Sequence, residues 1–372
     1  MRVYNIGMKR KKVALGLSGG VDSAVSAWLL REQGYEVIGV FMECYHEDGC
    51  RSDEDRQDAL KVAMQLQIPF QSLDFRSEYK QKVLDYFYTS YQAGKTPNPD
   101  MACNREIKFG LFYQWAMKNG FDYLATGHYA RVELKAEEKK VLLYTPVDKK
   151  KDQTYFLALV AEDKWSKVLF PLGEKTKKQV RAMAHELKLG VANKKESMGV
   201  CFVGDLPMRD LLSGQIKPKK GLIVREINGE RQVIGEHEGV EFYTIGQRHG
   251  LKIKPQEVDT PIYYVKKKEK ENNILLVGEK EELKQEWVLL KMIKTEALIN
   301  LAEKSYYLRI RHQGELIKIT KIEKEGEKWQ IALEKKVFGA SEGQFGVIYE
   351  KDKKMSDDYW VVGVGEIEFG EK

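Results

Sequence analysis

The stretch Leu-Gly-Leu-Ser-Gly-Gly-Val-Asp-Ser spans residues 15–23 and decides the fold of the first half of the chain. A short apolar run, Lys12 to Leu17, leads into the glycines, and a helical pattern runs from Asp22 to Gln33 and stops at Gly34. The sequence therefore predicts a buried strand, a glycine-rich turn and a helix, in that order. Because glycine has no Cβ, the backbone can turn sharply and present its N–H groups and the positive helix end to an anion.

Strand and helix signals alternate over the following hundred residues. The expected strands are Glu36 to Met42, Ile68 to Leu73 and Phe121 to Thr126; the expected helices are Asp53 to Gln67, Glu78 to Gln92 and Asn104 to Asn119. An alternating βαβα order is typical of an α/β domain with a doubly wound parallel sheet, whose ligands bind at the carboxyl ends of the strands.

The pattern changes near Lys217. From there on, short alternating runs are separated by glycines and charged turns, and helical periodicity is scarce. This texture predicts a small β-rich linking domain followed by a C-terminal β-barrel. We expect three domains: the α/β domain at 1–208, the central domain at 209–278 and the barrel at 279–372.

Composition narrows the class of protein. The formal net charge is +6, a balance that permits a nucleic-acid partner without requiring one. Apolar runs fall short of the ~18 residues of a membrane span, and the first residues lack the apolar core of a secretory signal. We therefore expect a cytoplasmic protein with no membrane partner. Four cysteines are too few for a disulfide framework, so a cysteine in a polar loop becomes a candidate for chemistry.

The glycine loop has two interpretations from its residues alone. It is either a phosphate site or an ordinary strand-to-helix turn in which Asp22 caps the helix. A Walker-type P-loop is excluded because no GxxxxGK[ST] occurs; Gly94-Lys95-Thr96 is followed by Pro97, which is incompatible with the helix that such a loop opens. The hexapeptide Ser18 to Ser23 resembles the pyrophosphatase loop of the N-type ATP pyrophosphatases. That resemblance implies ATP binding and AMP transfer, with nucleotide contacts from Gly16, Leu17, Ser18, Gly19, Gly20, Val21, Asp22, Ser23, Met42 and Gly127.

Two further loops carry cysteines. In Thr-Pro-Asn-Pro-Asp-Met-Ala-Cys-Asn, residues 96–104, we expect an extended loop and a helix capped by Asn104. Cys103 would then lie beside the helix N-terminus, where the dipole favours a thiolate, with Asp100 near enough to act as acid or base. A small, inert, buried cysteine is the alternative. Cys201 lies in a glycine-flanked loop, residues 194–204. Taken alone, this loop is only a weak indication of a reactive cysteine.

The order of these motifs is more specific than any one of them. Ser18 to Ser23, residues 96–104, Ala125 to Arg131, Lys151 to Leu157 and Gly199 to Gly204 together resemble the tRNA-specific 2-thiouridylases over nearly the whole chain. The resemblance implies ATP- and Mg²⁺-dependent thiolation of the tRNA wobble uridine at C2. Cys201 would carry the persulfide, Cys103 would be the second nucleophile and Asp100 the acid/base.

The same resemblance implies partners and further contacts. The partners would be tRNA and a persulfide donor, either a cysteine desulfurase or a sulfur-relay protein. The tRNA contacts would be Asn98, Pro99, Asp100, His128, Lys151, Asp152, Gln153, Arg309, Ile310 and Gln344. The chain departs from the family pattern at Ser197-Met198-Gly199-Val200, where Ser-Thr-Gly-Ile is usual, and at Ile310 and His312 in the barrel.

Other functions stay open at the level of sequence. A different pyrophosphatase-loop ligase would adenylate another substrate, although it has no use for Cys103 and Cys201. An iron–sulfur-dependent tRNA thiolase would use Asp100, Cys103 and Cys201 as cluster ligands. Cys44, His46 and Cys50 fall short of a closed zinc set, so we assign no resident metal site and expect a loop near the nucleotide.

Overall fold

The computed structural model describes residues 10–46, 51–135, 140–195, 208–253, 261–295, 299–353 and 357–369. The chain forms two compact units. The first contains residues 1–83, 100–205 and 357–361, and the second contains 84–99, 206–356 and 362–372. Within the described ranges, no helix combines the length and apolar character needed to span a membrane.

A parallel sheet organises the first unit, and its strand order is β3-β2-β1-β4-β7. Every neighbouring pair in it is parallel. The strands are β1 (Lys12–Gly16), β2 (Glu36–Glu43), β3 (Phe70–Asp74), β4 (Tyr123–Ala125) and β7 (Val168–Leu169). The three strands predicted after β1 are confirmed with small shifts at their ends. The chain adds β2 and β3 on one side of β1 and then β4 on the other, so a topological switch point lies between β1 and β4. Ligands of such sheets bind at the carboxyl ends of the strands at this point.

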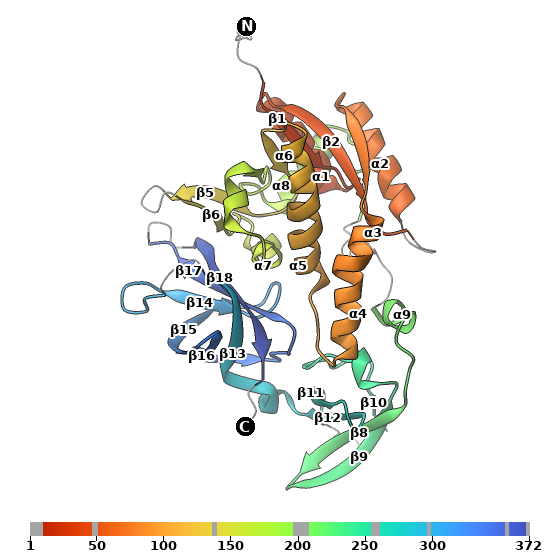
Figure 1. Ribbon diagram of the computed structural model, residues 1–372, viewed down its shortest axis with the longest axis vertical. Helices are drawn as coiled ribbons and strands as arrows, with labels where there is room; N and C mark the ends of the chain where they lie inside the picture. Colours follow the sequence, from red (N-terminus) through yellow and green to blue (C-terminus); the bar gives the residue numbers. More distant parts are fainter. Residues whose placement is uncertain are drawn as a thin grey trace. The chain divides into compact units, whose positions relative to one another are not determined.

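Helices cover both faces of this sheet (Figure 1). Val13 and Leu15 of β1, with Leu17 just after it, share one buried core with apolar residues of α1 (Val21–Glu32), α2 (Ser52–Gln65) and α8 (Lys177–Glu186). Gly16 points to the other face, where a Cβ atom would lie 3.6 Å from the ring of Phe112. The α/β, doubly wound class is confirmed.

The helix that carries Cys103 begins earlier than predicted. α5 (Pro99–Cys103) continues without a break into a π-helix at Asn104–Phe112 and then into α6 (Tyr113–Lys118). The prediction that Asn104 caps this helix is wrong. The prolines favour an extended loop, yet the fixed φ of Pro99 suits the first helical position, where no N–H needs a partner. The helical run predicted at Glu78 to Gln92 is present as α3 (Arg76–Tyr79), a π-helical segment (Lys80–Leu84) and α4 (Asp85–Gln92).

Several elements of the first unit were not predicted. They include a hairpin of β5 (Arg131–Lys135) and β6 (Lys140–Tyr144), the short α7 (Thr154–Leu157), 3-10 turns at Lys149–Lys151 and Glu162–Lys167, and α8. The first residues of β18 (Tyr359–Glu368) pair with this hairpin, with Trp360 opposite Tyr144. Asp358, just before β18, is ion-paired with Arg131 at 2.6 Å and Lys149 at 2.8 Å. The C-terminal strand therefore fixes the start of the 3-10 turn that carries Lys151.

The second unit contains a small mixed sheet with strand order β10-β9-β8-β12-β11. Its strands are β8 (Gly221–Ile227), β9 (Glu230–His237), β10 (Lys252–Ile253), β11 (Tyr264–Glu269) and β12 (Ile274–Gly278), and the short helix α9 (Met208–Ser213) precedes them. Most residues of β9 are polar and exposed, so this strand shows little of the apolar alternation that predicts a strand. Ile223, Ile234, Val265 and Leu275 belong to one buried core under this sheet.

A closed antiparallel barrel follows in the same unit. β13 (Lys284–Thr295), β16 (Lys328–Phe338), β15 (Ile317–Glu325), β14 (Tyr306–Arg309), β17 (Phe345–Lys351) and β18 are neighbours in this order, and pairing of β13 with β18 closes the ring. 3-10 turns at Val240–Phe242 and Lys280–Leu283 complete the elements of this unit. The predicted order of a β-rich linking domain and a barrel is confirmed.

Candidate functional site

The glycine loop joins β1 to α1 at the switch point of the sheet. Gly19 has a φ of +72°, and a Cβ atom there would lie 2.2 Å from the carbonyl oxygen of Asp55, so only glycine fits. Gly20 is the N-cap of α1, and no side chain caps the helix start. The first amides of α1 therefore have no intrahelical partners, which is the arrangement that lets a helix start bind an anion. Ser18 and Ser23 place their hydroxyl oxygens 3.2 Å apart beside this turn.

The loop after β4 closes against the same helix start. A Cβ atom on Gly127 would lie 2.9 Å from the amide nitrogen of Ser23, so this glycine allows two backbones to touch. On the opposite side of β1, the terminal methyl of Met42 lies 3.3 Å from where Gly16 would carry a Cβ. The structure thus places Gly16, Met42 and Gly127 near the glycine loop.

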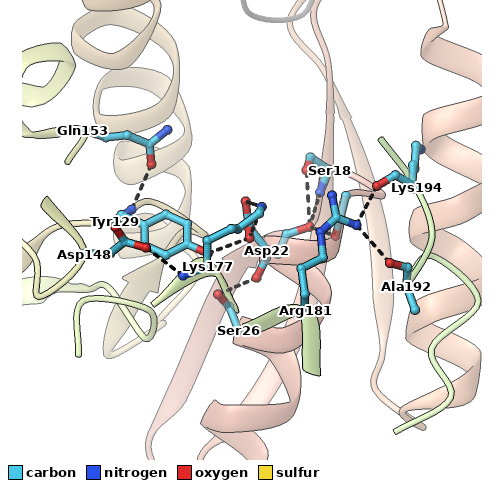
Figure 2. Close-up of polar contacts among 12 residues, drawn as sticks. Ser18, Asp22, Ser26, Tyr129, Asp148, Gln153, Lys177, Arg181, Ala192 and Lys194 are labelled. Atoms are coloured by element: carbon cyan, nitrogen blue, oxygen red, sulfur yellow. Dashed lines mark hydrogen bonds and ion pairs between the residues drawn. The ribbon is translucent and has the colours of Figure 1, made fainter. Parts of the chain in front are cut away.

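Asp22, in the first turn of α1, holds a half-buried basic partner (Figure 2). The ammonium Nζ of Lys177 donates to both carboxylate oxygens of Asp22 at 2.8 Å, and the hydroxyl of Tyr129 donates to Oδ1 at 3.0 Å. The Lys177 side chain is 14% exposed and the Asp22 side chain 32% exposed, so the pair is partly shielded from solvent. Gln153 accepts the Tyr129 backbone N–H at 2.8 Å and thereby fixes the loop after β4.

A second lysine binds the outer side of the glycine loop. Lys194 Nζ donates to the Gly19 carbonyl at 3.1 Å and forms ion pairs with Asp55 and Asp58, each at 2.7 Å. Burial raises the pKa of Asp58, but the hydrogen bond and charge of Lys194 outweigh it, so the net shift is downward. Arg181 holds the carbonyl oxygens of Ala192 and Lys194 at 2.9 and 2.7 Å (Figure 2). Direct polar contacts therefore connect the glycine loop with α2 and with residues 192–194.

Cys103 lies at the end of α5 and is fully buried. Asp100 is three residues earlier in the same helix, a spacing that puts both on one side. The predicted dipole effect on the thiol loses its basis, because the helix begins at Pro99 and the effect fades within the first turn. Asn104 donates from Nδ2 to the Phe156 carbonyl at 3.1 Å instead of capping a helix.

The remaining cysteines can be placed only in part. Cys44 is buried after β2, whereas Cys50 and Cys201 lie outside the described residues. Among the residues that the structure describes, no group of three or more His, Cys, Asp or Glu side chains is arranged to hold a metal ion.

His128 is a buried, neutral imidazole. The Lys108 ammonium can only donate hydrogen bonds, so Nε2 of His128 accepts from it at 3.4 Å. The other ring nitrogen, Nδ1–H, donates to the Thr126 hydroxyl at 2.8 Å. Burial, and then the charge of Lys108, lower the pKa of His128 well below 6.5. The ring packs against Phe109 and Phe170.

We expect the protein to lose stability as the pH falls below about 6.5, the ordinary histidine pKa. Below this pH His128 binds a proton in the unfolded chain and stays neutral in the folded protein. The free energy of unfolding therefore falls by up to about 1.4 kcal/mol per pH unit for this group. Urea unfolding between about pH 7.5 and 5.5 measures the slope. Burial also lowers the pKa of His237, so the comparison of His128→Gln with the parent isolates His128. Equal slopes in both proteins would contradict the prediction.

Asp152 and Gln153, in the segment predicted to touch RNA, both make hydrogen bonds within the first unit. Asp152 is buried, and its Oδ1 accepts from the Thr154 amide at 2.9 Å and hydroxyl at 2.6 Å. Gln153 holds Tyr129, as described above. Lys151 ends the 3-10 turn Lys149–Lys151 and is half-buried. Of these three residues, Lys151 is the one whose charge fits a phosphate contact.

In the second unit, the barrel holds the loop that precedes α5. Gln344 Nε2 donates to the carbonyl oxygens of Thr96 and Pro97 at 3.0 and 3.3 Å, and the Thr96 amide donates to the Glu342 carbonyl at 2.8 Å. Asn98 and Pro99 follow and are buried. Gln344 therefore has a positioning role that the sequence did not indicate.

Arg309 and Ile310, also in the barrel, are 8% and 6% exposed. The Arg309 guanidinium lies 5.1 Å from the centre of the Tyr349 ring.

Comparison with known proteins places the chain in a family. Residues 11–205 match the family described as tRNA methyl transferase HUP domain, 209–279 its PRC-barrel domain, and 290–363 the aminomethyltransferase beta-barrel domain. A tRNA-specific 2-thiouridylase MnmA 1 from Geobacillus kaustophilus is 47% identical over 73% of this chain and 73% of its own length. The corresponding MnmA of Bacillus subtilis is 40% identical over 92% of each chain.

The chain belongs to the tRNA-specific 2-thiouridylase family. It is accordingly an enzyme, a tRNA-uridine sulfurtransferase. Among solved structures, the U34-tRNA thiolase NcsA from Methanococcus maripaludis with its [4Fe-4S] cluster aligns at 19% identity over 56% of this chain and 66% of that chain. Its TM-score is 0.36, a likeness too weak to carry a functional conclusion.

Sequence reasoning missed the basic residues around the family's glycine loop. Lys177 and Lys194 are 155 and 175 residues from their partners Asp22 and Gly19. One readable signal was present: Thr176 and Gln179 form a capping box at the start of α8, and this motif places Lys177 at a helix N-terminus. The motif predicts the helix, but it does not indicate which loop the lysine reaches.

Proposed function

We propose that this enzyme uses ATP to adenylate the C2 oxygen of the tRNA wobble uridine and then replaces that oxygen with sulfur. The observation that carries the proposal is the uncapped start of α1 behind Gly19 and Gly20, at the switch point of a parallel sheet. Free amides, a helix dipole and two serine hydroxyls at one point are suited to bind a polyphosphate. Gly16, Leu17, Val21, Met42 and Gly127 surround the same loop and would contact the rest of the nucleotide.

Mg²⁺ is the proposed companion of the nucleotide. Mg²⁺ usually binds through one or two carboxylates together with phosphate oxygens, and Asp22 supplies a carboxylate at the helix start. The ion would neutralise the charge that develops on the leaving pyrophosphate. In the structure Asp22 is occupied by Lys177 and Tyr129, so this contact requires a rearrangement.

The sulfur step is proposed to use both thiols. Adenylation turns a poor leaving group into AMP, and the terminal sulfur of a Cys201 persulfide attacks C2 as AMP departs. The Cys103 thiolate then attacks the Cys201 sulfur, which leaves the transferred sulfur on the uridine and forms a Cys103–Cys201 disulfide. Asp100 is the proposed acid/base in these steps. A cysteine desulfurase or sulfur-relay protein supplies the persulfide, and an external thiol reduces the disulfide. Because Cys103 is fully buried, the 99–112 helix must expose it first.

RNA binding is the proposed task of the remaining residues. Asn98, Pro99 and Asp100 would contact the uracil, because they lead into the helix that carries Cys103. Lys151, with its neighbours Asp152 and Gln153, would contact the RNA backbone. His128 would contact the tRNA as well. Arg309, Ile310 and Gln344 are the proposed contacts from the barrel. The proposed domains are a catalytic domain at 1–208, a central domain at 209–278 and the barrel at 279–372. We propose that the enzyme works in the cytoplasm.

In vitro thiolation of a tRNA transcript tests the whole proposal. The reaction contains ATP, Mg²⁺ and a persulfide source, and nucleoside mass spectrometry reads the product. We expect 2-thiouridine, and we expect pyrophosphate release only when tRNA is present. Pyrophosphate release without tRNA would indicate a different ligase, and a coloured protein after anaerobic purification would indicate an iron–sulfur cluster.

Lys151→Ala should weaken tRNA binding and reduce its salt dependence. Removal of one phosphate contact lowers the slope of log K against log salt by about one. Filter binding of tRNA at several salt concentrations gives the slope. Lys151→Arg, which keeps the charge, is the control and should retain the slope. An unchanged slope for Lys151→Ala would remove Lys151 from the RNA surface.

A further inference from the structure

The ion pair between Lys177 and Asp22 occupies the carboxylate that the proposed nucleotide site requires. Lys177 Nζ lies 2.8 Å from both oxygens of Asp22, and Asp22 stands in the first turn of α1, next to the amides that would receive phosphate. A divalent cation at those two oxygens would be repelled by an ammonium at this distance, because both carry positive charge. The entry of Mg²⁺ and a polyphosphate therefore favours the departure of the ammonium from Asp22.

The structure shows which part of Lys177 can move. Its backbone is fixed at the start of α8, where its N–H donates to Asp148 Oδ2 at 2.8 Å and Thr176 and Gln179 cap the helix. Figure 2 shows the side chain extending from there past Tyr129 to Asp22. The four-carbon stem has rotatable bonds and ends in three donors, so the ammonium can change partner while α8 stays in place.

The glycine loop itself holds no basic residue between Ser18 and Ser23. An ATP polyphosphate carries several negative charges, and the ammonium of Lys177 already lies at the helix start where they would bind. Lys194 lies on the outer side of the loop and is held by Gly19, Asp55 and Asp58. Of these two lysines, Lys177 is the one whose partner belongs to the first turn of α1.

We propose that Lys177 exchanges partners on nucleotide binding: it neutralises Asp22 in the free enzyme and moves to the polyphosphate of ATP when Mg²⁺ takes Asp22. Lys177 thereby becomes a nucleotide-binding residue contributed by α8. Tyr129 keeps its hydrogen bond to Asp22 Oδ1 and holds the carboxylate in place through the exchange. The inference rests on the proposed ATP site and adds a residue to it.

The test is calorimetric titration with adenosine 5′-(α,β-methylene)triphosphate at saturating Mg²⁺. This analogue resists cleavage of the α–β bond, so binding is measured without turnover. Lys177→Met keeps the length of the side chain and removes its charge, and we expect it to weaken binding about 10- to 100-fold. Lys177→Arg should recover most of that affinity. Lys178→Met changes the same charge at an exposed neighbour in α8 and should bind like the parent.

Adenosine is the second probe, because it has no phosphate for Lys177 to contact. The exchange predicts that Lys177→Met and the parent bind adenosine equally, which also shows that the variant is folded. If Lys177 were only a structural partner of Asp22, its removal would free the carboxylate, and triphosphate affinity would stay constant or rise; that result overturns the inference. If the parent itself failed to bind the triphosphate, the ATP site would be wrong, which is a distinguishable outcome.

Discussion

Cys201→Ser should consume ATP in the presence of tRNA yet form no 2-thiouridine, a loss of about 10³-fold or more in product formation. Adenylation needs the glycine loop and the target base, and it uses neither thiol. Cys103→Ser should accept sulfur on Cys201 and stall before the sulfur is released to the uridine. Peptide mass spectrometry after one turnover detects the persulfide, and nucleoside analysis of the tRNA detects the product.

The same experiment identifies the thiol pair. A turnover without added reductant should join Cys103 to Cys201, which requires their Cα atoms to approach within about 4.4–6.8 Å. Cys103 is fully buried in the 99–112 helix, so we expect its alkylation to be slow in the free enzyme and faster when tRNA and ATP are bound. Cys44→Ala is the matched control, since Cys44 is also buried and has no assigned role. Parental thiolation by Cys201→Ser would overturn the mechanism, and inactive Cys44→Ala would show that the wrong thiols were paired.

Gly20→Val should abolish tRNA-dependent pyrophosphate release, by about 10²-fold or more, while leaving the protein folded. The backbone of Gly20 has φ −95° and ψ 163°, which any residue adopts, and its Cβ would meet only the Ser18 hydroxyl, at 3.4 Å. The added side chain would instead stand over the helix amides and block the approach of a phosphate. Thermal unfolding checks the fold, and a pyrophosphate assay measures the loss.

The contrast with Gly19 makes this test specific. Gly19 has a φ of +72° and no room for a Cβ, so Gly19→Val should damage the loop itself and lower stability. Gly20→Ala, with its smaller side chain, should show an intermediate loss of pyrophosphate release. Normal release by Gly20→Val would remove the loop from the nucleotide site.

Elements whose signals lie in adjacent residues were determined by the local sequence pattern. The strand, glycine turn and helix around residues 15–23 follow from apolar runs and from residues next to them, so their positions were predictable. The β-rich second half was predictable for the same reason. The error at Asn104 is also local: two signals competed, and the preference of Pro99 for a first helical position prevailed over the preference of Asn104 for a cap.

Tertiary structure alone decided which side chains meet at the loop. Lys177 reaches Asp22 across 155 residues because α1 and α8 pack on the same face of the sheet, where Val180 and Ala184 share a core with Ala24 and Val25. The barrel likewise brings Gln344 to Thr96 across 248 residues. Periodicity reports which face of an element is apolar, but it holds no information on which distant element covers that face. The sequence alone therefore determined the position of the glycine loop, and the packing of α8 decided which lysine reaches the helix that follows it.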